Sequence, residues 1–355
     1  MFPFGVNLTP ISIHQDEPPS VISISYGIGE EDYPQADREL FDTFAMKLGL
    51  AGVTIVVSSG DDGVAGNHAR ASGAYPKGLS ACGYTPQWPA SSPWITSVGG
   101  TQGPEYGIEE IAAQGDNGGV ITSGGGFSNL YSRPSWQEQQ VFNFILMEDF
   151  FDKSEEPVPG FNLSGRAYPD VSAMARRFMV VINGKTVPVY GTSASAPTFA
   201  AMVALINSAA SDAGLANVGY LNPAIYKDQG KNIDLFTDIL TGDNKCAAAT
   251  RLHVNSKTKL VVANRCAQGF TANVGWDPVT GLGTPKFGKM LDHFLSNLPE
   301  KEPDNEMGTL AYAGIAAFGL NVATLGASLI AQYAKNMEDT GTPWNTTSED
   351  GAIRL

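Results

Sequence analysis

Ser193 lies in the sequence Gly-Thr-Ser-Ala, at the point where a short β-rich run at residues 187–190 gives way to an apolar segment. Pro197 stands where a first helical turn is expected. A hydroxyl group at the start of a helix lies near the positive end of the helix dipole, which favours an alkoxide and its tetrahedral adduct. Ser193 is therefore a candidate nucleophile. The alternative is that Thr192 or Ser195 simply caps a buried helix.

A second candidate group is the carboxyl group of Asp61, in the sequence Ser-Ser-Gly-Asp-Asp-Gly at residues 58–63. A β-branched run at residues 53–57 precedes it, so Asp61 is expected at the carboxyl end of a strand. A carboxyl group stabilises an oxyanion only as a hydrogen-bond donor, and it must be protonated to donate, through burial or through an acidic working pH. The alternatives are an ordinary turn or a cation site.

Asp238 and Asp277 are two separated aspartates that stand beside turn-forming, glycine-containing sequence. Calcium binds six or more hard oxygen ligands, and two carboxylates with exposed backbone carbonyl groups supply that chemistry. The alternative is that both are turn aspartates.

The elements that must position these groups follow an α/β pattern. Residues 21–27 are expected to form a buried strand, and residues 34–49 an amphipathic helix with Gly49 as its stop. Four apolar residues at helical spacing mark the inner face of that helix: Leu40, Phe41, Phe44 and Leu48. With the strand at residues 53–57, this spacing predicts a right-handed parallel unit.

Five segments in a fixed order carry a more specific signal than any single motif. They are SISYG at 23–27, SSGDDG at 58–63, SGGGFS at 123–128, GTSASAPTFAAMVALIN at 191–207 and GWDPVTGLGTP at 275–285. In this order they resemble the sedolisin family, the serine-carboxyl peptidases that share the subtilisin fold and include tripeptidyl peptidases. The resemblance implies a subtilisin-like α/β domain with a mainly parallel sheet and helices on both faces.

The resemblance also implies roles for individual residues. Ser193 corresponds to the acylated nucleophile, and Asp61 to the aspartate of the oxyanion hole. Substrate is expected to pair as an added strand with the main chain of Ser25, Tyr26 and Gly27, although an interior strand remains the alternative. The implied calcium ligands are the side chains of Asp238 and Asp277 with the carbonyl oxygens of Ile239, Asn273 and Gly275.

Two further motifs resemble functional sites, a triad acid and a phosphate-binding loop, but we assign neither role. Asp170, in Tyr-Pro-Asp-Val-Ser-Ala, looks like a triad acid, but the matching aspartate of the family is not one, so a structural role is expected. The glycine run at residues 123–128 resembles a phosphate cradle, but it lacks a following Lys-Ser/Thr and a strand-to-helix pattern. Close backbone packing is the expected role of the run.

No residue of the chain is assigned as the general base. In the resembled family the base is a glutamate, oriented by an aspartate on the same helix, well before the segment matched by residues 21–27. Asp16 and Glu17 are too close to that segment, and no aspartate precedes His14 in the subtilisin order. Residues 1–20 also lack the features of a signal peptide. We therefore expect the propeptide and the first part of the catalytic domain to be missing from this sequence.

Composition adds limits on partners and compartment. With 22 basic and 36 acidic residues, the net charge of −14 argues against nucleic acid or an anionic membrane surface as a partner. The resemblance implies a secreted or extracellular, monomeric protein that acts on peptides or proteins. Cys246 and Cys266 bracket a polar loop and would pair in such a protein, leaving Cys82 over. Three free thiols in a cytosolic protein are the alternative.

The domain organisation predicted from the sequence ends with a tail. Residues 1–300 form the peptidase domain, 301–307 a charged linker, 308–334 an uncharged segment and 335–355 a polar tail. The uncharged segment is long enough to span a bilayer, but its alanine and glycine content makes its hydrophobicity marginal. A transmembrane helix and a loosely docked or disordered helix both stay open.

Two functions follow from these observations. In the first, the chain is the carboxyl-terminal part of a tripeptidyl-peptidase-like, acid-active enzyme that acylates Ser193, with Asp61 in the oxyanion hole. In the second, it is a catalytically inactive product that binds calcium and peptide.

Overall fold

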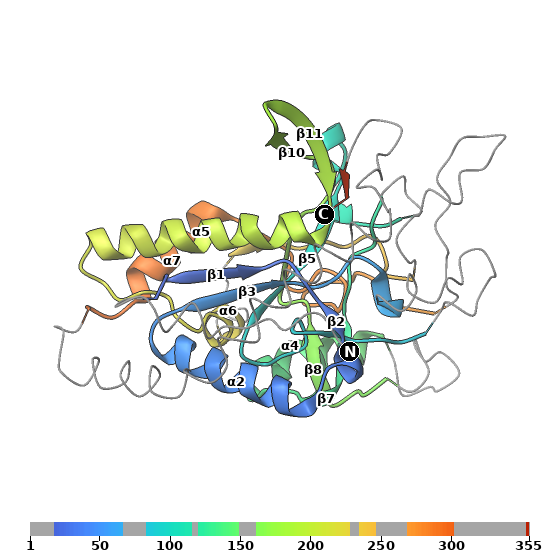
Figure 1. Cartoon of the computed structure of the whole chain (residues 1–355), viewed down its shortest axis with the longest axis horizontal. Coiled ribbons are helices and arrows are strands. Elements are labelled where there is room, and N and C mark those ends of the chain that lie inside the picture. The colour runs from blue at the N-terminus through green and yellow to red at the C-terminus, as the bar shows by residue number, and fades with distance from the viewer. Residues whose placement is uncertain are drawn as a thin grey trace, which may run out of the picture.

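The computed structural model describes residues 18–66, 83–115, 120–148, 161–227, 234–245 and 268–301, and the backbone of residues 353–354. The three cysteines, the segment 308–334 and the residues His14, Asp16 and Glu17 lie outside the described residues, so the expectations about them stay predictions. The described chain forms an α/β domain with helices on both faces of a mainly parallel sheet (Figure 1).

The central sheet has the strand order β1-β3-β5-β6, and β9 also pairs with β5. Four strands are parallel to their neighbours: β1 (Val21–Ile24), β3 (Thr54–Ser58), β5 (Thr96–Gln102) and β9 (Val171–Met174). The short β6 (Ile111–Ala112) runs antiparallel to β5. Every residue of β3 is buried, as expected for a central parallel strand that is covered on both faces.

The first strand is shorter and more exposed than the sequence suggested. β1 ends at Ile24, only Ile22 in it is buried, and Ser25 and Tyr26 beyond it are exposed. Among the described strands β1 pairs with β3 alone, so it lies at the edge of the sheet. The prediction of a buried strand over residues 21–27 was therefore wrong, because an edge strand keeps one side open to solvent. An edge position is what peptide pairing would require.

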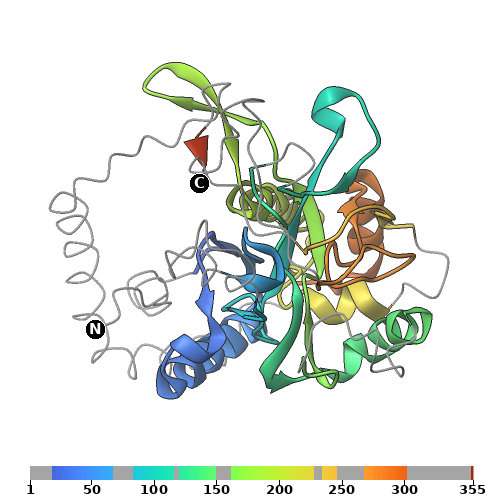
Figure 2. The ribbon, with the colours of Figure 1, turned by 90° about the vertical axis from the view of Figure 1, so that its right-hand side faces the viewer.

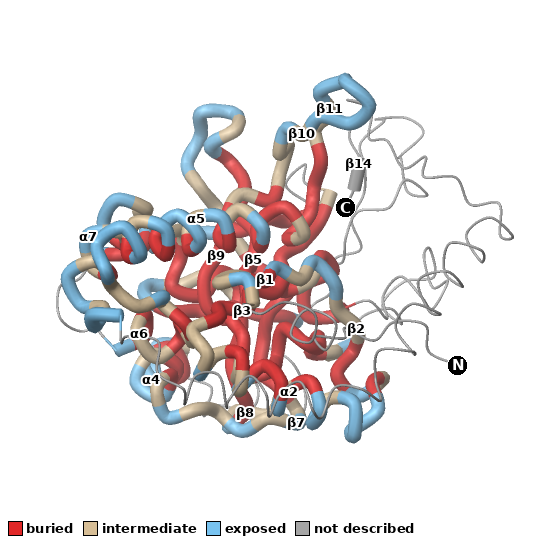
Figure 3. The backbone as a smooth tube through the Cα atoms, turned by 60° about the vertical axis from the view of Figure 1, so that its left-hand side comes forward, coloured by how far each residue is buried: buried red, intermediate tan, exposed pale blue. Residues whose placement is uncertain are grey.

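Alternation along β3 divides the apolar core between the two faces of the sheet. Ile55 and Val57 belong to the cluster beneath α2 (Gln35–Leu50), whereas Val56 belongs to the cluster beneath α5 (Thr192–Asp212). The division arises because successive side chains of a strand point to opposite faces. In Figure 1, α5 and α7 (Phe287–Asn297) lie above the sheet and α2 below it, and Figure 3 shows burial concentrated between these layers.

The helix α2 agrees with its sequence pattern except at two positions. It buries three of the four expected residues: Phe41, Phe44 and Leu48. Leu40 is instead 39% exposed. The helix also continues through Gly49, the expected stop, where a Cβ atom would lie 3.2 Å from the Cβ atom of Tyr220. This glycine is therefore needed for close packing against the neighbouring loop.

One described helix, α5, is long and apolar enough to cross a membrane by length and composition, with a mean hydropathy of 1.2. Half of its most apolar stretch is buried inside the domain, and the helix packs against β1, β3, β5 and β9. Its composition is therefore that of a core helix.

The remaining elements surround this framework. The hairpin of β10 (Phe178–Ile182) and β11 (Lys185–Tyr190) projects from the domain (Figure 2), and β14 (Ile353–Arg354) pairs with the end of β11. Two further helices are α4 (Glu138–Met147) and α6 (Asn222–Lys227). The other strand pairs are β2 (Ile28–Gly29) with β4 (Gln87–Trp88), β7 (Gly126–Ser132) with β8 (Gly165–Tyr168), and β12 (Phe236–Thr237) with β13 (Thr284–Pro285). Short 3-10 helices are η1 (Glu30–Asp32), η2 (Gly63–Ala65), η4 (Pro104–Tyr106) and η5 (Ser135–Gln137).

The glycine run after Ser123 packs backbone against backbone on the loop that carries Asp61. The N–H of Gly124 donates to the carbonyl of Gly60 at 2.8 Å, and the N–H of Thr122 donates to the carbonyl of Asp61 at 2.9 Å. A Cβ atom on Gly124 would lie 2.4 Å from the carbonyl oxygen of Ser59. The contacts agree with the packing role expected for this run.

We predict that Gly124→Ala destabilises the domain by about 1–3 kcal/mol or more, because the added methyl group meets backbone atoms that have to shift. Gly288→Ala is the matched control, since Gly288 lies exposed in α7 with nothing within 4 Å of its Cβ position. Alanine there should be neutral or stabilise the helix by up to about 1 kcal/mol. Urea unfolding of both variants measures the difference, and equal stability would contradict the packing argument.

Candidate active site

Ser193 is the second residue of α5 and is half-buried. β11 leads into it through Gly191, whose φ of 148° is a conformation that residues with a side chain rarely adopt. The N–H of Gly191 donates to the carbonyl of Ala175 at 2.9 Å, which ties the turn to the end of β9. The strand-to-helix junction predicted from the sequence is therefore present, and Ser193 lies in the first turn of the helix.

Asp61 follows β3, and its carboxyl group contacts Thr192, the residue directly before Ser193. Its Oδ1 atom accepts a hydrogen bond from the N–H of Thr192 at 2.8 Å and another from the Oγ1 of Thr192 at 2.9 Å. Gly60 donates its N–H to the same Oγ1 at 3.2 Å. Asp61 is buried, with 6% of its surface exposed. The structure therefore brings together the two candidate residues, which are 132 positions apart in the sequence.

Residues 25–27, the segment expected to pair with substrate, also reach Ser193. Ser25 donates its Oγ hydrogen to the carbonyl oxygen of Ser193 at 3.0 Å. Tyr26 is 38% exposed, and Gly27 is half-buried. The segment that follows the edge strand β1 thus lies beside Ser193.

Asp170 is a buried residue whose side chain links neighbouring elements, and none of its hydrogen bonds or ion pairs involves Ser193. Its carboxylate forms an ion pair with the buried Arg166 at 2.6 Å and accepts hydrogen bonds from the N–H of Ser97 at 2.7 Å and the hydroxyl of Tyr226 at 2.9 Å. Burial lowers the pKa of Arg166, but the charge of the Asp170 carboxylate and other nearby groups outweigh it and raise the pKa above its usual value. These contacts join β5, β8 and α6, as expected for a structural aspartate.

The residues expected to bind calcium lie on the loop at residues 273–277 and on the segment at 238–239 that contacts it. Asp238, at the surface, accepts the N–H of Gly275 at 2.8 Å, and partial burial raises its pKa. Asp277 is fully buried, and burial raises its pKa to about 7, although four hydrogen bonds favour its charged form. The donors are the N–H groups of Asn273, Val279 and Thr280 and the hydroxyl of Thr280. Within the described residues, no group of three His, Cys, Asp or Glu side chains converges as a metal site.

Sequence reasoning did not identify two contributors to the site. Thr192 was considered only as a helix cap, but its N–H and hydroxyl hold Asp61. The hydroxyl of Ser25 was not considered, because only its main chain was expected to act. The sequence signal for the contact of Ser25 with the carbonyl of Ser193 was Pro197, four residues after Ser193. Proline has no N–H, so it cannot donate to that carbonyl.

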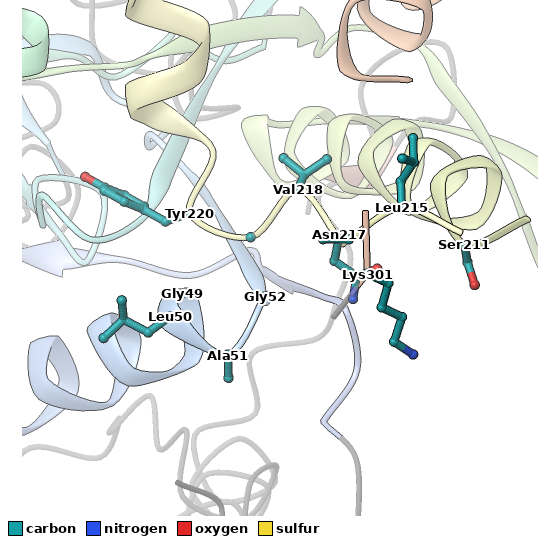
Figure 4. A pocket seen from close by; sticks show the side chains of 12 residues that line it. Gly49, Leu50, Ala51, Gly52, Ser211, Leu215, Asn217, Val218, Tyr220 and Lys301 are labelled. Carbon is teal, nitrogen blue, oxygen red and sulfur yellow. The ribbon is translucent and has the colours of Figure 1, made fainter. Parts of the chain in front are cut away.

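A cavity of about 420 Å³ lies at the opposite end of the domain (Figure 4). It is lined by the end of α2, by residues 215–220 and by Ser211 of α5. Ser211 is 18 residues beyond Ser193 along the helix, about 27 Å at the usual rise per residue. The cavity is therefore separate from Ser193 and the first turn of α5.

Comparisons with known proteins agree with this geometry. A model of the subtilase family matches residues 8–225, more than half of the chain. The chain is 36% identical over 299 residues to tripeptidyl-peptidase sed1 of Aspergillus fumigatus, covering 79% of this chain and 41% of that protein. It is 35% identical over 286 residues to tripeptidyl-peptidase 1 of Homo sapiens, covering 78% of this chain and 44% of that protein. The chain thus spans less than half the length of these curated relatives.

Among solved structures, a Pseudomonas sedolisin, a serine-carboxyl proteinase in complex with pseudo-iodotyrostatin, matches with a TM-score of 0.58 and 27% identity. The match covers 78% of this chain and 66% of that one. By the family model, the relatives and this structure, the chain belongs to the subtilase family, within its sedolisin group.

Proposed function

We propose that the chain carries the nucleophile and oxyanion-hole part of a serine peptidase of the tripeptidyl-peptidase-like kind. The observation that carries the proposal is the contact between Asp61 and Thr192, which sets a carboxyl group beside Ser193 at the start of α5. In the proposed reaction, Ser193 Oγ attacks the substrate carbonyl carbon, and the carbonyl oxygen becomes an oxyanion. The departing Ser193 proton requires a general base, which the resemblance assigns to an upstream glutamate.

The hydrogen bonds of Asp61 indicate how it would act. Oδ1 accepts both hydrogen bonds from Thr192, so a proton donated to the oxyanion belongs on Oδ2. A neutral carboxyl group keeps Oδ1 as an acceptor, and the contacts with Thr192 are compatible with that state. Because Asp61 must be protonated to donate and the glutamate base must be ionised to accept, we infer that the enzyme works in acid.

Peptides are the proposed substrates. The relatives are named tripeptidyl-peptidases, and the edge strand β1 is followed by residues 25–27, which lie beside Ser193. An extended peptide paired with this edge would present a carbonyl group to the nucleophile. The secreted location implied by the resemblance stays a prediction.

We further propose a structural calcium site on the loop at residues 273–277. Within this loop, the carboxylate of Asp277 accepts the N–H of Asn273 at 3.1 Å, and the carboxylate of Asp238 accepts the N–H of Gly275 at 2.8 Å. Among the described residues, no hydrogen bond is donated to the carbonyl oxygens of Ile239, Asn273 or Gly275. Hard oxygen donors of this kind suit Ca²⁺, which would neutralise carboxylate charge and stabilise the loop.

The first prediction concerns the base. Residues 1–355 expressed alone should show little or no cleavage between acid and neutral pH, and an aldehyde inhibitor should not label Ser193, because serine without a base is a poor nucleophile. Cleavage with an acid optimum should be restored by joining an upstream segment that carries the family's glutamate base and, four residues later, its orienting aspartate (Glu-x-x-x-Asp). Ser193→Ala should abolish that cleavage. Robust Ser193-dependent cleavage by residues 1–355 alone would mean that another carboxylate acts as the base.

The second prediction concerns Asp61 in the chain joined to that segment. Asp61→Ala should lower kcat by about a hundredfold or more, the effect of losing one oxyanion-hole donor. Asp61→Asn should retain more activity and extend it towards neutral pH, because an amide placed with its oxygen towards Thr192 donates from the Oδ2 position at any pH. A pH-rate profile of the three proteins measures both effects. An unchanged rate in Asp61→Ala would remove this residue from the mechanism.

The third prediction concerns calcium. Asp238→Ala should abolish most of the rise in melting temperature that calcium gives, but should change little in chelator, because binding to the folded state alone stabilises it. Asp277→Ala should destabilise the protein in both conditions, since Asp277 also accepts four hydrogen bonds. Asp234→Ala, at an exposed aspartate paired with Lys286, is the control and should keep the calcium response. A full calcium response in Asp238→Ala would rule out this site.

A further inference from the structure

A proline interrupts the backbone hydrogen bonding of α5 at the carbonyl group of Ser193. Pro197 is the sixth residue of α5. In an α-helix, the N–H of residue 197 would donate to the carbonyl of Ser193, but proline has no N–H. The carbonyl group of the nucleophile residue therefore loses its usual helical donor.

Ser25 supplies a donor to that carbonyl from the other side of the site. Its Oγ lies 3.0 Å from the carbonyl oxygen of Ser193, across 168 positions of sequence. A serine hydroxyl has one hydrogen to donate, so the hydrogen committed to Ser193 is not donated to a substrate. A hydrogen bond donated by Ser25 to substrate would then come from its main-chain N–H.

We propose that Ser25 is a positioning residue, whose hydroxyl fixes the substrate-pairing edge relative to Ser193 through the carbonyl group that Pro197 leaves open. This inference rests on the proposed function. β1 is an edge strand that ends at Ile24, so residues 25–27 lie beyond its pairing with β3. The tie to Ser193 holds their main chain at a set distance from the nucleophile. Small displacements of a bound substrate can cost a large factor in rate, which makes such a tie valuable.

Pro197 allows the positioning role to be separated from a role in stability. Pro197→Ala restores an N–H that can donate to the carbonyl of Ser193, so it satisfies the carbonyl group without Ser25. It does not restore a link between Ser193 and residues 25–27. Losing the Ser25 hydroxyl should therefore matter less for stability in the Pro197→Ala background, but should matter equally for catalysis.

The stability arm uses urea unfolding of residues 1–355. Ser25→Ala should lower the folding equilibrium constant about fivefold, and less than about twofold when combined with Pro197→Ala. Ser25→Thr keeps the hydroxyl and should resemble the wild type. Ser23→Ala, at an exposed serine two residues earlier on β1, is the matched control and should have little effect. A Ser25→Ala effect equal to that of Ser23→Ala would overturn the tie itself.

The catalytic arm uses the chain joined to the upstream Glu-x-x-x-Asp segment, with a peptide substrate. Ser25→Ala should lower kcat at least about tenfold, with a smaller change in KM, in both the Pro197 and the Pro197→Ala backgrounds. Ser25→Thr should recover most of the rate. If Pro197→Ala rescues kcat as well as stability, Ser25 merely satisfies a carbonyl group, and the proposal is wrong. If the joined wild-type chain does not cleave at all, the proposed function fails, and the positioning role falls with it, whereas the urea measurements still decide whether the tie exists.

Discussion

The site depends on one contact, in which the carboxyl group of Asp61 meets the amino-terminal end of α5. A buried carboxyl group needs hydrogen-bond donors, and the first residue of a helix has an N–H with no partner inside the helix. Thr192 supplies that N–H and adds its hydroxyl. The contact joins the loop after β3, on which Asp61 lies, to the turn after β11, on which Ser193 lies. The glycine run after Ser123 can approach this loop because it carries no side chains there.

The general fold could be predicted from the sequence because its main elements have strong local patterns. The β-branched run of β3, the helical spacing of α2 and the apolar segment of α5 each indicate their own structure, and the subtilisin-like α/β class is confirmed by the matches. The resemblance carried by the five ordered motifs also assigned Ser193 and Asp61 to one site, and in the structure Asp61 contacts Thr192, the neighbour of Ser193. The end of β1, the exposure of Leu40 and the packing role of Gly49 depend on tertiary neighbours, which local spacing does not encode.

Three aspartates show why residue type alone does not identify function. Asp170 has its acceptor positions occupied by Arg166, Tyr226 and a backbone N–H, so it fixes the fold. Asp277 accepts four hydrogen bonds, which uses the full acceptor capacity of a carboxylate, and a cation there would replace or share one of them. The Oδ1 atom of Asp61 accepts both of its hydrogen bonds from Thr192, the residue directly before Ser193. The three aspartates differ in which of their oxygen atoms accept hydrogen bonds and in which elements supply the donors. Sequence spacing shows neither of these differences.

The order of elements along the chain has a consequence for how the domain is made. α5 has no charged residue before Asp212 and is long and apolar enough to pass for a membrane span by length and composition, so it exposes a long uncharged stretch while unfolded. All four parallel strands of the central sheet precede it in the sequence. During synthesis from the amino terminus, the surface that α5 covers has therefore left the ribosome before the helix does. Chain order thus means that the strands against which α5 packs are already synthesised when α5 emerges.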